Sequence, residues 1–600
     1  MNSETRTCQN CHQDFTIDPG DFDFYRKIDV PPPTWCPRCR LQRRLIWRNE
    51  RNFYRDTCGL CGKDVISAIP KTAGYTIYCS ICWYSDRWDP LAYGQDYNFS
   101  RPFLEQFHNL MLRVPHRSLV NPKSVNSDYT NYSAENKNCY IVVSTVLCED
   151  CAYGYRLREA KNCFDCVDVT KSEFCYECLD CAQCSRCAFC AYCQSLVDCF
   201  LCYDCRGLNS CFGCVGLRNK SHHWLNQPLQ RSEYEKRLHE ILDDRQKWQT
   251  EKTKYQELLL GFPRKYAHIL RSERCTGDNI LTSKNCKNCF FIENIVDSRH
   301  VLATANLKDS GDVSFDDDSE LDYEIISGWK DYRYMFAYSC WYSQDVQYSA
   351  SCLDSSFLFG CVGLRNKKFC VLNQQYSKEE YEKLVPQVIE HMNTTPYTAT
   401  GGRVYKYGEY FPPEFSPFPY NESVAQEHFP LTKEEAITSG YAWKEPETRN
   451  YQIDIRPESL PNLKDATDDI SNKIIGCAHD GKCHEQCTIA FKIIPPELQF
   501  YRRMNIFLPR LCPNCRHHER RARRNPMKLW HRHCGCGGQG RQLNTTPSQD
   551  VVTSCEGVVC QNTATHFHGD QPCPNEFETS YAPDRLEIVY CERCYQSEVA

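Results

Sequence analysis

The sequence lacks several features that would assign the chain to a common class. No apolar run is long enough to cross a bilayer, and the first residues contain no apolar segment of the secretory kind. Phosphate-binding glycine loops, Gly-x-Ser-x-Gly elbows and His-Glu-x-x-His motifs are missing. The net charge of -6 over 600 residues gives the whole chain no attraction to nucleic acids or membranes. We therefore expect no catalytic site and no membrane partner.

Cysteine, in contrast, is abundant, with 44 in the chain. Without an export signal the chain is expected in the cytoplasm, where thiols stay reduced. Spaced cysteines in that compartment are metal ligands or buried thiols more often than disulfides. The length of 600 residues predicts several domains, because single cores rarely grow beyond ~300 residues.

Two internal duplications organise the chain. The segment from Cys11 to Cys58 matches Cys487 to Cys534 at an offset of 476 residues, without a gap. In the interior, the sequence "GCVGLRNK" ends at 220 and again at 367, an offset of 147 residues. Copying at fixed length is typical of repeat units whose geometry tolerates no insertion.

The cysteine-rich interior follows a period of three residues within a period of twelve. Every third position from Cys139 to Cys214 gives 26 sites, of which 17 are cysteine and none is charged. A period of three fits neither a helix nor a flat strand. It fits a narrow solenoid of 12-residue coils, whose thin interior accepts small buried residues such as cysteine.

The second copy keeps this series but replaces most of its thiols. Its 26 equivalent positions, from Cys286 to Cys361, hold five cysteines beside aliphatic residues. Asp316, Asp322 and Asp331 break the uncharged rule, so we expect distorted coils there and a solvated acidic surface rather than a calcium loop. For the thiols of the first copy, inert packing is favoured, with soft-metal binding and redox chemistry as alternatives.

Helices are predicted after each repeat, where they are expected to cap it. Capping boxes are expected at Ser232 with Glu235, at Ser377 with Glu380 and at Thr432 with Glu435. An outward aromatic stripe is expected to dock against the chain's own helices rather than to stack on bases or peptides. Its members are Tyr140, Phe164, Tyr176, Phe200 and Phe212.

Paired Cys-x2-Cys knuckles near the N-terminus predict two zinc sites, because tetrahedral Zn²⁺ needs two tight turns that face each other. The expected ligands are Cys8, Cys11, Cys36 and Cys39 at the first site and Cys58, Cys61, Cys79 and Cys82 at the second. Small modules of this kind depend on the metal for their fold.

The C-terminal copy departs from this spacing, although about four structural zinc ions are expected in all. Its expected ligands are Cys483, Cys487, Cys512 and Cys515 at one site and Cys534, Cys536, Cys591 and Cys594 at the other. The insertion within the second site holds residues that suggest one more site, whose role stays open. They are Cys555, Cys560, His566, His568 and Cys573.

Arginines interleaved with aromatic residues follow the second Cys-x2-Cys knuckle at each end, after Cys39 and after Cys515. This composition suits phosphate contact and base stacking, as in proteins that bind RNA or single-stranded DNA. The alternative is that the arginines balance the negative charge of the zinc–thiolate centres. The candidate residues are Arg40, Arg43, Arg44, Arg48, Arg520, Arg521, Arg523 and Arg524.

The N-terminal segment contains Cys8-x2-Cys11, Phe15, Phe24-Tyr25, Pro33 and Cys36-Pro-x-Cys39-Arg40. Through this pattern residues 8–43 resemble the family called probable zinc-ribbon domain, and residues 483–520 resemble it as a degenerate copy. The resemblance implies a zinc-held ribbon or treble-clef element without known catalytic activity. Through "SRPFLEQF", "GCVGLRNK" and "HGDQPCPNEFETSYAPDR" the whole chain resembles long cysteine-rich hypothetical proteins of uncultivated bacteria.

These patterns predict a mainly β, multidomain protein with terminal zinc-ribbon or treble-clef modules that flank two duplicated 12-residue-coil β-solenoids, each capped by helices. The predicted boundaries are a double zinc module at 1–95, a helical connector at 96–126, the first solenoid at 127–227, capping helices at 228–272, the second solenoid at 273–374, a capping helix at 375–395, a Tyr/Pro-rich connector at 396–473 and a double zinc module at 474–600.

The predicted function is that of a non-catalytic zinc-binding scaffold or binding protein. Its expected partners are RNA or single-stranded DNA, or another protein, and the oligomeric state is left open. The alternative is a thiol-based metal-handling or redox protein that uses the cysteine-lined solenoid.

Overall fold

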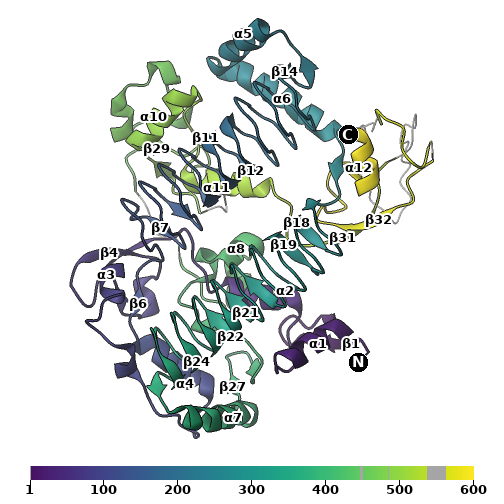
Figure 1. Ribbon diagram of the computed structural model, residues 1–600. Helices are drawn as coiled ribbons and strands as arrows, with labels where there is room; N and C mark the ends of the chain where they lie inside the picture. Colours follow the sequence, from purple (N-terminus) through teal and green to yellow (C-terminus); the bar gives the residue numbers. More distant parts are fainter. Residues whose placement is uncertain (1, 446–449, 484–485, 537–561, 570, 600) are drawn as a thin grey trace. The chain divides into compact units, whose positions relative to one another are not determined.

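The computed structural model describes residues 2–445, 450–483, 486–536, 562–569 and 571–599. These residues belong to two compact units, each of which combines a terminal cysteine-rich segment with an interior repeat (Figure 1). Unit 1 comprises Met1–Leu119 and Ala267–Glu445, and unit 2 comprises Val120–Tyr266 and Pro446–Ala600. We call residues 127–227 repeat 1, which lies in unit 2, and residues 273–374 repeat 2, which lies in unit 1.

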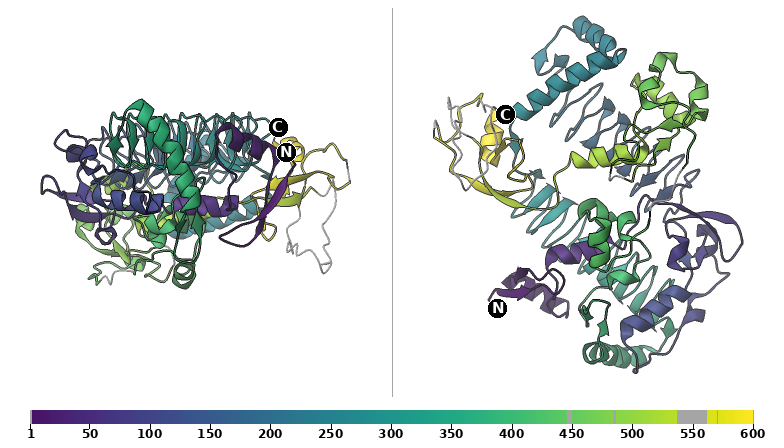
Figure 2. Two further views of the ribbon diagram at one scale, coloured as in Figure 1. Left: turned by 90° about the horizontal axis from the view of Figure 1, so that it is seen from below. Right: turned by 180° about the vertical axis from the view of Figure 1, so that it is seen from behind.

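Both repeats are built by parallel pairing between segments twelve residues apart. In repeat 1, Val167 pairs with Leu179 on one side and with Tyr155 on the other. In repeat 2, Val346 pairs with Leu358. Bridges outside the named strands keep the same step along both repeats, except at the start of repeat 2, where Glu273 pairs with Lys284 at a step of eleven. The period of twelve in the sequence is therefore the step of the backbone pairing, and the stacked segments can be followed in Figure 2.

The backbone of both repeats also turns with a period of three. From Asn138 to Asp204, every third residue has a φ between 46° and 59°, in the left-handed region. This conformation costs a side-chain-bearing residue roughly 1–2 kcal/mol. Hydrogen bonds between neighbouring segments offset that cost: the Asn138 N–H donates to the Val125 carbonyl and the Lys137 N–H to the Cys148 carbonyl. The residue after each left-handed position belongs to the three-residue series.

Side chains of this series are buried in both repeats. The Cys163 thiol donates to the carbonyls of Lys161 and Ser172 over 3.5 Å. Its backbone N–H donates to Cys151 Sγ over 3.4 Å. The Cys151 thiol therefore accepts a backbone N–H of the next segment, whereas the carbonyls that accept the Cys163 thiol already accept backbone N–H groups in the parallel pairing.

Serine takes the place of cysteine at three of these positions in repeat 2, Ser298, Ser310 and Ser349. The Ser310 N–H donates to Ser298 Oγ over 3.2 Å, and the Cys361 N–H donates to Ser349 Oγ over 3.1 Å. A hydroxyl one segment away thus receives the same N–H that a thiol receives in repeat 1. Serine and cysteine can replace each other at these positions because both are small and both offer a hydrogen-bonding atom.

The three aspartates of repeat 2 lie inside it, with 4% or less of each side chain exposed. The expected solvated surface is therefore wrong for these residues. The expected distortion is wrong as well, because the pairing of Tyr323 with Met335 keeps the twelve-residue step. Ser319 donates to Asp316, and the Tyr334 N–H donates to Asp322. Burial raises the pKa of Asp316 to about 7 and raises the pKa values of Asp322 and Asp331 well above their usual range.

Unit 1 begins with two β-hairpins, each followed by short helices, before the chain enters the connector. Its elements before repeat 2 are β1 (Glu4–Thr7), β2 (Asp14–Ile17), α1 (Pro19–Lys27), α2 (Pro37–Leu45), β3 (Tyr54–Thr57), β4 (Asp64–Ser67), β5 (Ile77–Tyr78), α3 (Ser80–Trp83), α4 (Phe103–Arg113) and β6 (His116–Arg117). Proline at the first position of α2 suits a helix start, where no backbone donor is needed.

The rest of unit 1 is repeat 2 and the segment after it. The strands are β17 (Ile269–Leu270), β18 (Gly277–Leu281), β19 (Cys289–Glu293), β20 (Gly311–Ser314), β21 (Tyr323–Ile326), β22 (Tyr332–Tyr338), β23 (Gln344–Gln347), β24 (Ser356–Phe359), β25 (Lys368–Val371), β26 (Gln374–Gln375), β27 (Tyr397–Thr398) and β28 (Val404–Tyr405). The helices are α7 (Lys378–Thr394), α8 (Val424–His428) and α9 (Lys433–Thr438).

Unit 2 has the matching composition. Repeat 1 and the helices after it contain β7 (Thr130–Asn131), β8 (Val142–Val143), β9 (Tyr155–Arg158), β10 (Val167–Thr170), β11 (Glu173–Tyr176), β12 (Leu179–Ala182), β13 (Ser185–Ala188), β14 (His223–Trp224), β15 (Gln227–Pro228), α5 (Arg231–Leu242), α6 (Arg245–Gly261) and β16 (Arg264–Lys265). The C-terminal segment contains β29 (Ile475–Gly476), β30 (Ala490–Phe491), α10 (Pro495–Met504), α11 (Pro513–Ala522), β31 (Trp530–His533), β32 (Glu576–Thr579), β33 (Val589–Tyr590) and α12 (Glu592–Val599).

Helices pack on the last segments of both repeats. The capping boxes at Ser377 with Glu380, before α7, and at Thr432 with Glu435, before α9, are confirmed. The box predicted at Ser232 is wrong, because α5 already begins at Arg231. Trp248 of α6 lies against Phe212 of repeat 1, with ring centroids 5.7 Å apart.

The fold as a whole consists of many short strands in small sheets, together with a smaller share of helix. Of the helices in the described parts of the chain, none is long and apolar enough to span a membrane.

Candidate metal centres and the arginine contacts beside them

The first cysteine quartet joins a hairpin to the start of a helix. Cys8 and Cys11 lie in the turn between β1 and β2, whereas Cys36 and Cys39 open α2. Their sulfur atoms lie within 4.8 Å of one another. The Cys36 N–H donates to Cys8 Sγ over 3.2 Å, and hydrogen bonds from Cys36 and Cys39 hold the pKa of Cys8 well below its usual value. The structure brings together the four cysteines predicted for this site.

The second quartet has the same plan and also matches its predicted residues. Cys58 and Cys61 lie between β3 and β4, and Cys79 and Cys82 lie at the start of α3. The Cys79 N–H donates to Cys58 Sγ over 3.3 Å. Burial acts to raise the pKa of Cys58, but backbone donors led by Cys79 lower it to about 6. Arg87 donates to Cys82 Sγ over 2.6 Å, a contact that favours the thiolate.

The third quartet differs from its prediction by one residue. It comprises Cys477, Cys487, Cys512 and Cys515, and the Cys512 N–H donates to Cys477 Sγ over 3.3 Å. The predicted ligand Cys483 lies beside this group, with its sulfur 3.7 Å from that of Cys515.

Strand pairing explains why Cys477 belongs to the quartet in place of the predicted Cys483. Ile475 pairs with Phe491, as Arg6 pairs with Phe15 in the N-terminal hairpin, so Cys477 occupies the place of Cys8. The span from Cys477 to Cys487 is ten residues, against three from Cys8 to Cys11, so seven residues are inserted in the turn. An ungapped alignment at an offset of 476 cannot reveal that ligand.

The fourth quartet comprises Cys534, Cys573, Cys591 and Cys594. The Cys591 N–H donates to Cys534 Sγ over 3.1 Å, which repeats the contact of the other three quartets. β31 pairs with β32 as β3 pairs with β4, so Cys573 takes the place of Cys61. The prediction of Cys536 in this quartet is corrected, because the insertion lies inside the turn and displaces the second ligand by 36 residues, the difference between spans of 39 and three.

Cys536 lies instead with two histidines of the insertion. Its group comprises Cys536, His566, His568 and Cys594, so Cys594 belongs to two groups. The insertion residues Cys555 and Cys560, which were also considered as ligands, lie outside the described residues.

All four cysteine quartets could hold a metal ion. In each, a backbone N–H from the start of a helix reaches the first hairpin sulfur over 3.1–3.3 Å. Such donors, and the positive end of a helix, stabilise the thiolate that binds metal. Four close thiolates fit the tetrahedral coordination of Zn²⁺.

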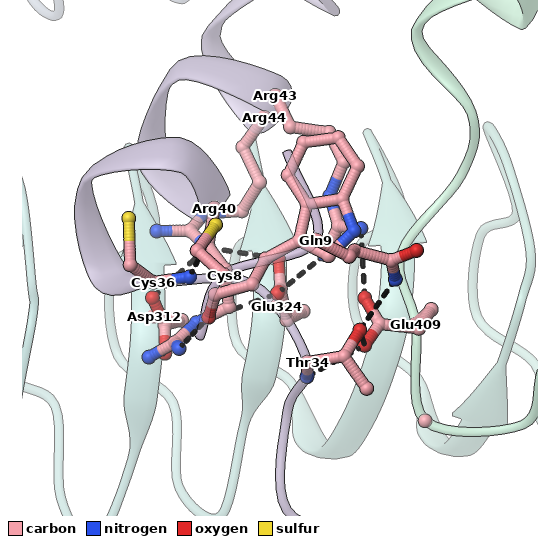
Figure 3. Close-up of polar contacts among 12 residues, drawn as sticks. Cys8, Gln9, Thr34, Cys36, Arg40, Arg43, Arg44, Asp312, Glu324 and Glu409 are labelled. Carbon is pink, nitrogen blue, oxygen red and sulfur yellow. Dashed lines mark hydrogen bonds and ion pairs between the residues drawn. The ribbon is translucent and has the colours of Figure 1, made fainter. Parts of the chain in front are cut away.

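The arginines of α2 face carboxylates of repeat 2 (Figure 3). Arg40 lies 2.7 Å from Asp312, and Arg44 lies 3.1 Å from Asp312 and 2.8 Å from Glu324. All four side chains are 2% exposed or less. Burial acts to raise the pKa of Asp312, but Arg40 and Arg44 hold it below its usual value. The two arginines and two acids form one buried ionic cluster.

Arg43 extends the cluster to a third acid. It donates to Glu324 and to Glu409, each over 2.9 Å, and lies over the ring of Trp35 with 4.4 Å to the centroid (Figure 3). Glu409 also accepts the Thr34 N–H over 2.9 Å. Three guanidinium groups thus meet three carboxylates, and such balance is needed where water is excluded.

Unit 2 contains the same cluster at equivalent positions. Arg516 lies 3.2 Å from Asp165, and Arg520 lies 2.9 Å from Asp165 and 2.8 Å from Glu177. Each arginine stands 476 residues after its counterpart in unit 1, and each acid stands 147 residues before its counterpart. The ionic contact in each unit is therefore formed between a copy of the terminal duplication and a copy of the interior duplication. Glu497 adds a further carboxylate, 3.1 Å from Arg516.

A third equivalent arginine differs between the units. Arg48 lies over the Phe315 ring, 4.1 Å from its centroid, and donates to Ser327 over 2.6 Å. Its counterpart Arg524 forms ion pairs with Asp168 and with Asp180, the latter at 2.6 Å. A ring and a hydroxyl of repeat 2 thus stand where repeat 1 has two carboxylates, and Arg48 forms its ion pair with Glu50 of its own segment instead, at 2.6 Å.

Every predicted nucleic-acid residue contacts its own unit. Arg521 lies over the Tyr155 ring at 5.6 Å, and Arg523 donates to the Glu177 carbonyl over 3.0 Å. The expectation of phosphate contact is corrected for the five buried arginines, because water is excluded and carboxylates or rings occupy their surroundings. These are Arg40, Arg43, Arg44, Arg48 and Arg520. The alternative of charge balance was closer, although the acids belong to the repeats and not to the cysteine centres.

Aromatic side chains complete the docking surface in both units. Tyr25 of α1 lies 5.5 Å from Tyr323, and Tyr501 of α10 lies 5.5 Å from Tyr176, centroid to centroid. Phe500 stacks on Phe164 at 4.3 Å. The outward aromatic stripe thus docks against the chain's own helices, as predicted.

Comparisons with known proteins assign this chain to no family. No protein-family model matches the chain, and no curated protein matches it. The resemblance of residues 8–43 to the probable zinc-ribbon domain accordingly stays a prediction from the sequence pattern.

Proposed function

We propose that the chain is a non-catalytic scaffold protein in which structural Zn²⁺ ions hold cysteine modules against two β-solenoids. The observation that carries the proposal is that metal ligands and docking arginines share one helix. α2 begins with Cys36 and Cys39 and continues with Arg40 and Arg44. α11 has the same order. An ion at the quartet orients the helix, and the oriented helix inserts its arginines between the acids of the repeat.

The solenoid part of the proposal is supported by the backbone. Parallel pairing at a step of twelve residues in almost every segment, left-handed residues at every third position and a continuous buried series are the features of a narrow coiled stack. The docked helices and aromatic residues cover part of its outer surface.

The choice of zinc is supported by the ligands and by the size of the modules. Each quartet offers four thiols, a donor set that suits Zn²⁺ and soft metals and does not suit Mg²⁺ or Ca²⁺. The strands of the hairpins are four residues long or shorter. An isolated hairpin of this size is marginal in water, so the ion supplies much of the folding free energy.

Hydrogen exchange on the full chain, with and without a zinc chelator, tests the proposal. We expect amides of α2 and α11 to lose protection when zinc is removed, together with amides around Asp312 and Asp165. Amides of β24, which lies away from these contacts in sequence, serve as the internal control and should keep their protection. Zinc removal without any change around Asp312 and Asp165 would contradict the proposal.

The alternative function, thiol-based metal handling or redox chemistry in repeat 1, receives less support. Its thiols are buried and donate to backbone carbonyls, as Cys187 does to Ser185 and Leu196. Alkylation of the native, zinc-loaded protein separates the two functions. Slow labelling throughout 139–214 supports packing, whereas rapid labelling or additional zinc bound by that segment supports the alternative.

A further inference from the structure

The insertion in the last cysteine module brings two histidines and Cys536 next to Cys594 of the fourth quartet. His566 Nδ1 lies 2.9 Å from Cys536 Sγ. His568 Nε2 lies 3.3 Å from Cys536 Sγ and 3.3 Å from Cys594 Sγ. The other three modules have turns without this insertion or with a shorter one. Two imidazoles and two thiols in contact form a ligand set that zinc proteins use widely.

The outward partners of the histidines set their tautomers. His566 Nε2 lies 2.7 Å from a carboxylate oxygen of Glu598, and His568 Nδ1 lies 2.6 Å from the Gln571 carbonyl oxygen. Both oxygens accept hydrogen bonds, so each of these nitrogens carries the proton. In a neutral ring the opposite nitrogen then has a free lone pair, and in both rings that nitrogen faces the sulfurs. Carboxylate and carbonyl acceptors behind metal-bound histidines are a recurring arrangement.

The sulfur of Cys536 has a further orienting contact. Asn562 Nδ2 donates to Cys536 Sγ over 3.2 Å, and the Tyr590 hydroxyl donates to Asn562 Oδ1 over 2.5 Å. Cys536 is 1% exposed and His566 is 3% exposed. The amide donor stabilises negative charge on the sulfur, and burial restricts access of water to the group.

We propose that this group binds a second ion beside the fourth quartet, and that the Cys594 thiolate bridges the two ions. The inference rests on the proposed function, in which the quartet holds Zn²⁺. Cys594 belongs to both four-residue groups, and a thiolate sulfur has lone pairs for two metals. The charge also favours the pair. One ion with four thiolates has a charge of two minus, whereas two ions with five thiolates and two neutral imidazoles have a charge of one minus.

Native mass spectrometry of the full zinc-loaded chain tests the ion count. We expect five zinc ions, and four in the variants Cys536→Ser and His566→Gln/His568→Gln. Retention of the other four ions shows that the variant modules remain folded. Four ions in the unsubstituted chain would overturn this inference and leave the proposed function intact. Fewer than four would contradict the proposed function itself.

The bridge is tested separately in the cadmium-substituted chain. Two cadmium nuclei that share a sulfur show a scalar coupling in cadmium NMR, and we expect one such coupled pair. The double variant Cys555→Ser/Cys560→Ser is the matched control and should keep five ions and the coupling. Loss of one ion in this control, or five uncoupled resonances in the unsubstituted chain, would overturn the bridging role of Cys594.

Discussion

The two units build the same contact from segments with different tolerance to insertion. In unit 2 the turns that carry the first two ligands have gained seven and 36 residues relative to unit 1. Across the same comparison, the arginines stay four residues apart and their carboxylate partners stay twelve apart, as in Arg40 and Arg44 with Asp312 and Glu324. A ligand in a turn is fixed by strand pairing at its base, so the turn can lengthen. A docked helix has no such freedom.

In the interiors of the repeats, the side chains differ while the backbone stays the same. Repeat 1 is lined largely by cysteine, and repeat 2 is lined by aliphatic residues, serine and three aspartates. The backbone step is the same in both. The stack therefore does not depend on a cysteine lining.

The largest expected effect comes from breaking a quartet. Cys477→Ser should remove one zinc ion and unfold its module, because apparent binding free energies of structural zinc are about 10–16 kcal/mol. Cys483→Ser, the matched control beside the same group, should keep the full zinc count. Native mass spectrometry and the thermal midpoint of unfolding measure both. Loss of an ion in Cys483→Ser, with the full count retained in Cys477→Ser, would support the ligand set predicted from the sequence.

The next effect comes from the equivalent ionic clusters. Asp312→Ala and Asp165→Ala should each lower the free energy of unfolding by about 3–5 kcal/mol, because each removes the buried carboxylate that two arginines share. The exposed pair of Arg186 with Asp198 provides the control, and Asp198→Ala should cost about 0–1 kcal/mol. Urea unfolding measures the differences. Equal small losses at all three sites would show that the clusters do not stabilise the contact between each cysteine module and the repeat of its own unit.

A smaller effect, confined to repeat 2, depends on pH. The pKa of Asp316 is raised to about 7 in the folded state, so its stabilising contribution is full below the unfolded value near 3.8 and is lost as the pH rises towards 7. Asp316→Asn should therefore raise the free energy of unfolding at pH 8 and change it little at pH 4. Val169 occupies the equivalent position in repeat 1, which should show no such dependence. A pH-independent effect of the substitution would contradict this expectation.

The smallest effect is expected from exchanging thiol and hydroxyl. Cys163→Ser in repeat 1 and Ser298→Cys in repeat 2 should each change the free energy of unfolding by about 1 kcal/mol, because either atom bonds the neighbouring backbone. Cys163→Leu is the contrasting variant and should cost more, about 1–3 kcal/mol, because leucine adds bulk to an already packed site and loses the hydrogen-bonding atom. Equal costs for serine and leucine would count against the hydrogen-bonding role.

The sequence predicted what depends on short spacing. The two N-terminal quartets and the twelve-residue step follow from residues that recur at fixed intervals, and the structure has them at those positions. Cys477 was missed, and Cys573 was assigned to an additional site rather than to the fourth quartet, because strand pairing, not spacing, decides which cysteine lies at the base of a lengthened turn. The buried carboxylates were missed because each arginine is neutralised by a residue far away in the chain. The signal was available, since Asp165 and Glu177 recur as Asp312 and Glu324.

The order of segments in the two units has a consequence for synthesis on the ribosome. In unit 2 the acids are synthesised before the arginines that bind them, because Asp165 leaves the ribosome well before Arg516. Unit 1 does not, since about 270 residues separate Arg40 from Asp312. At bacterial or eukaryotic rates of ~5–20 residues per second, that gap lasts roughly 14–54 s. For that interval the nascent N-terminal helix displays three arginines with no acids to receive them, so early metal capture preserves its shape until repeat 2 emerges.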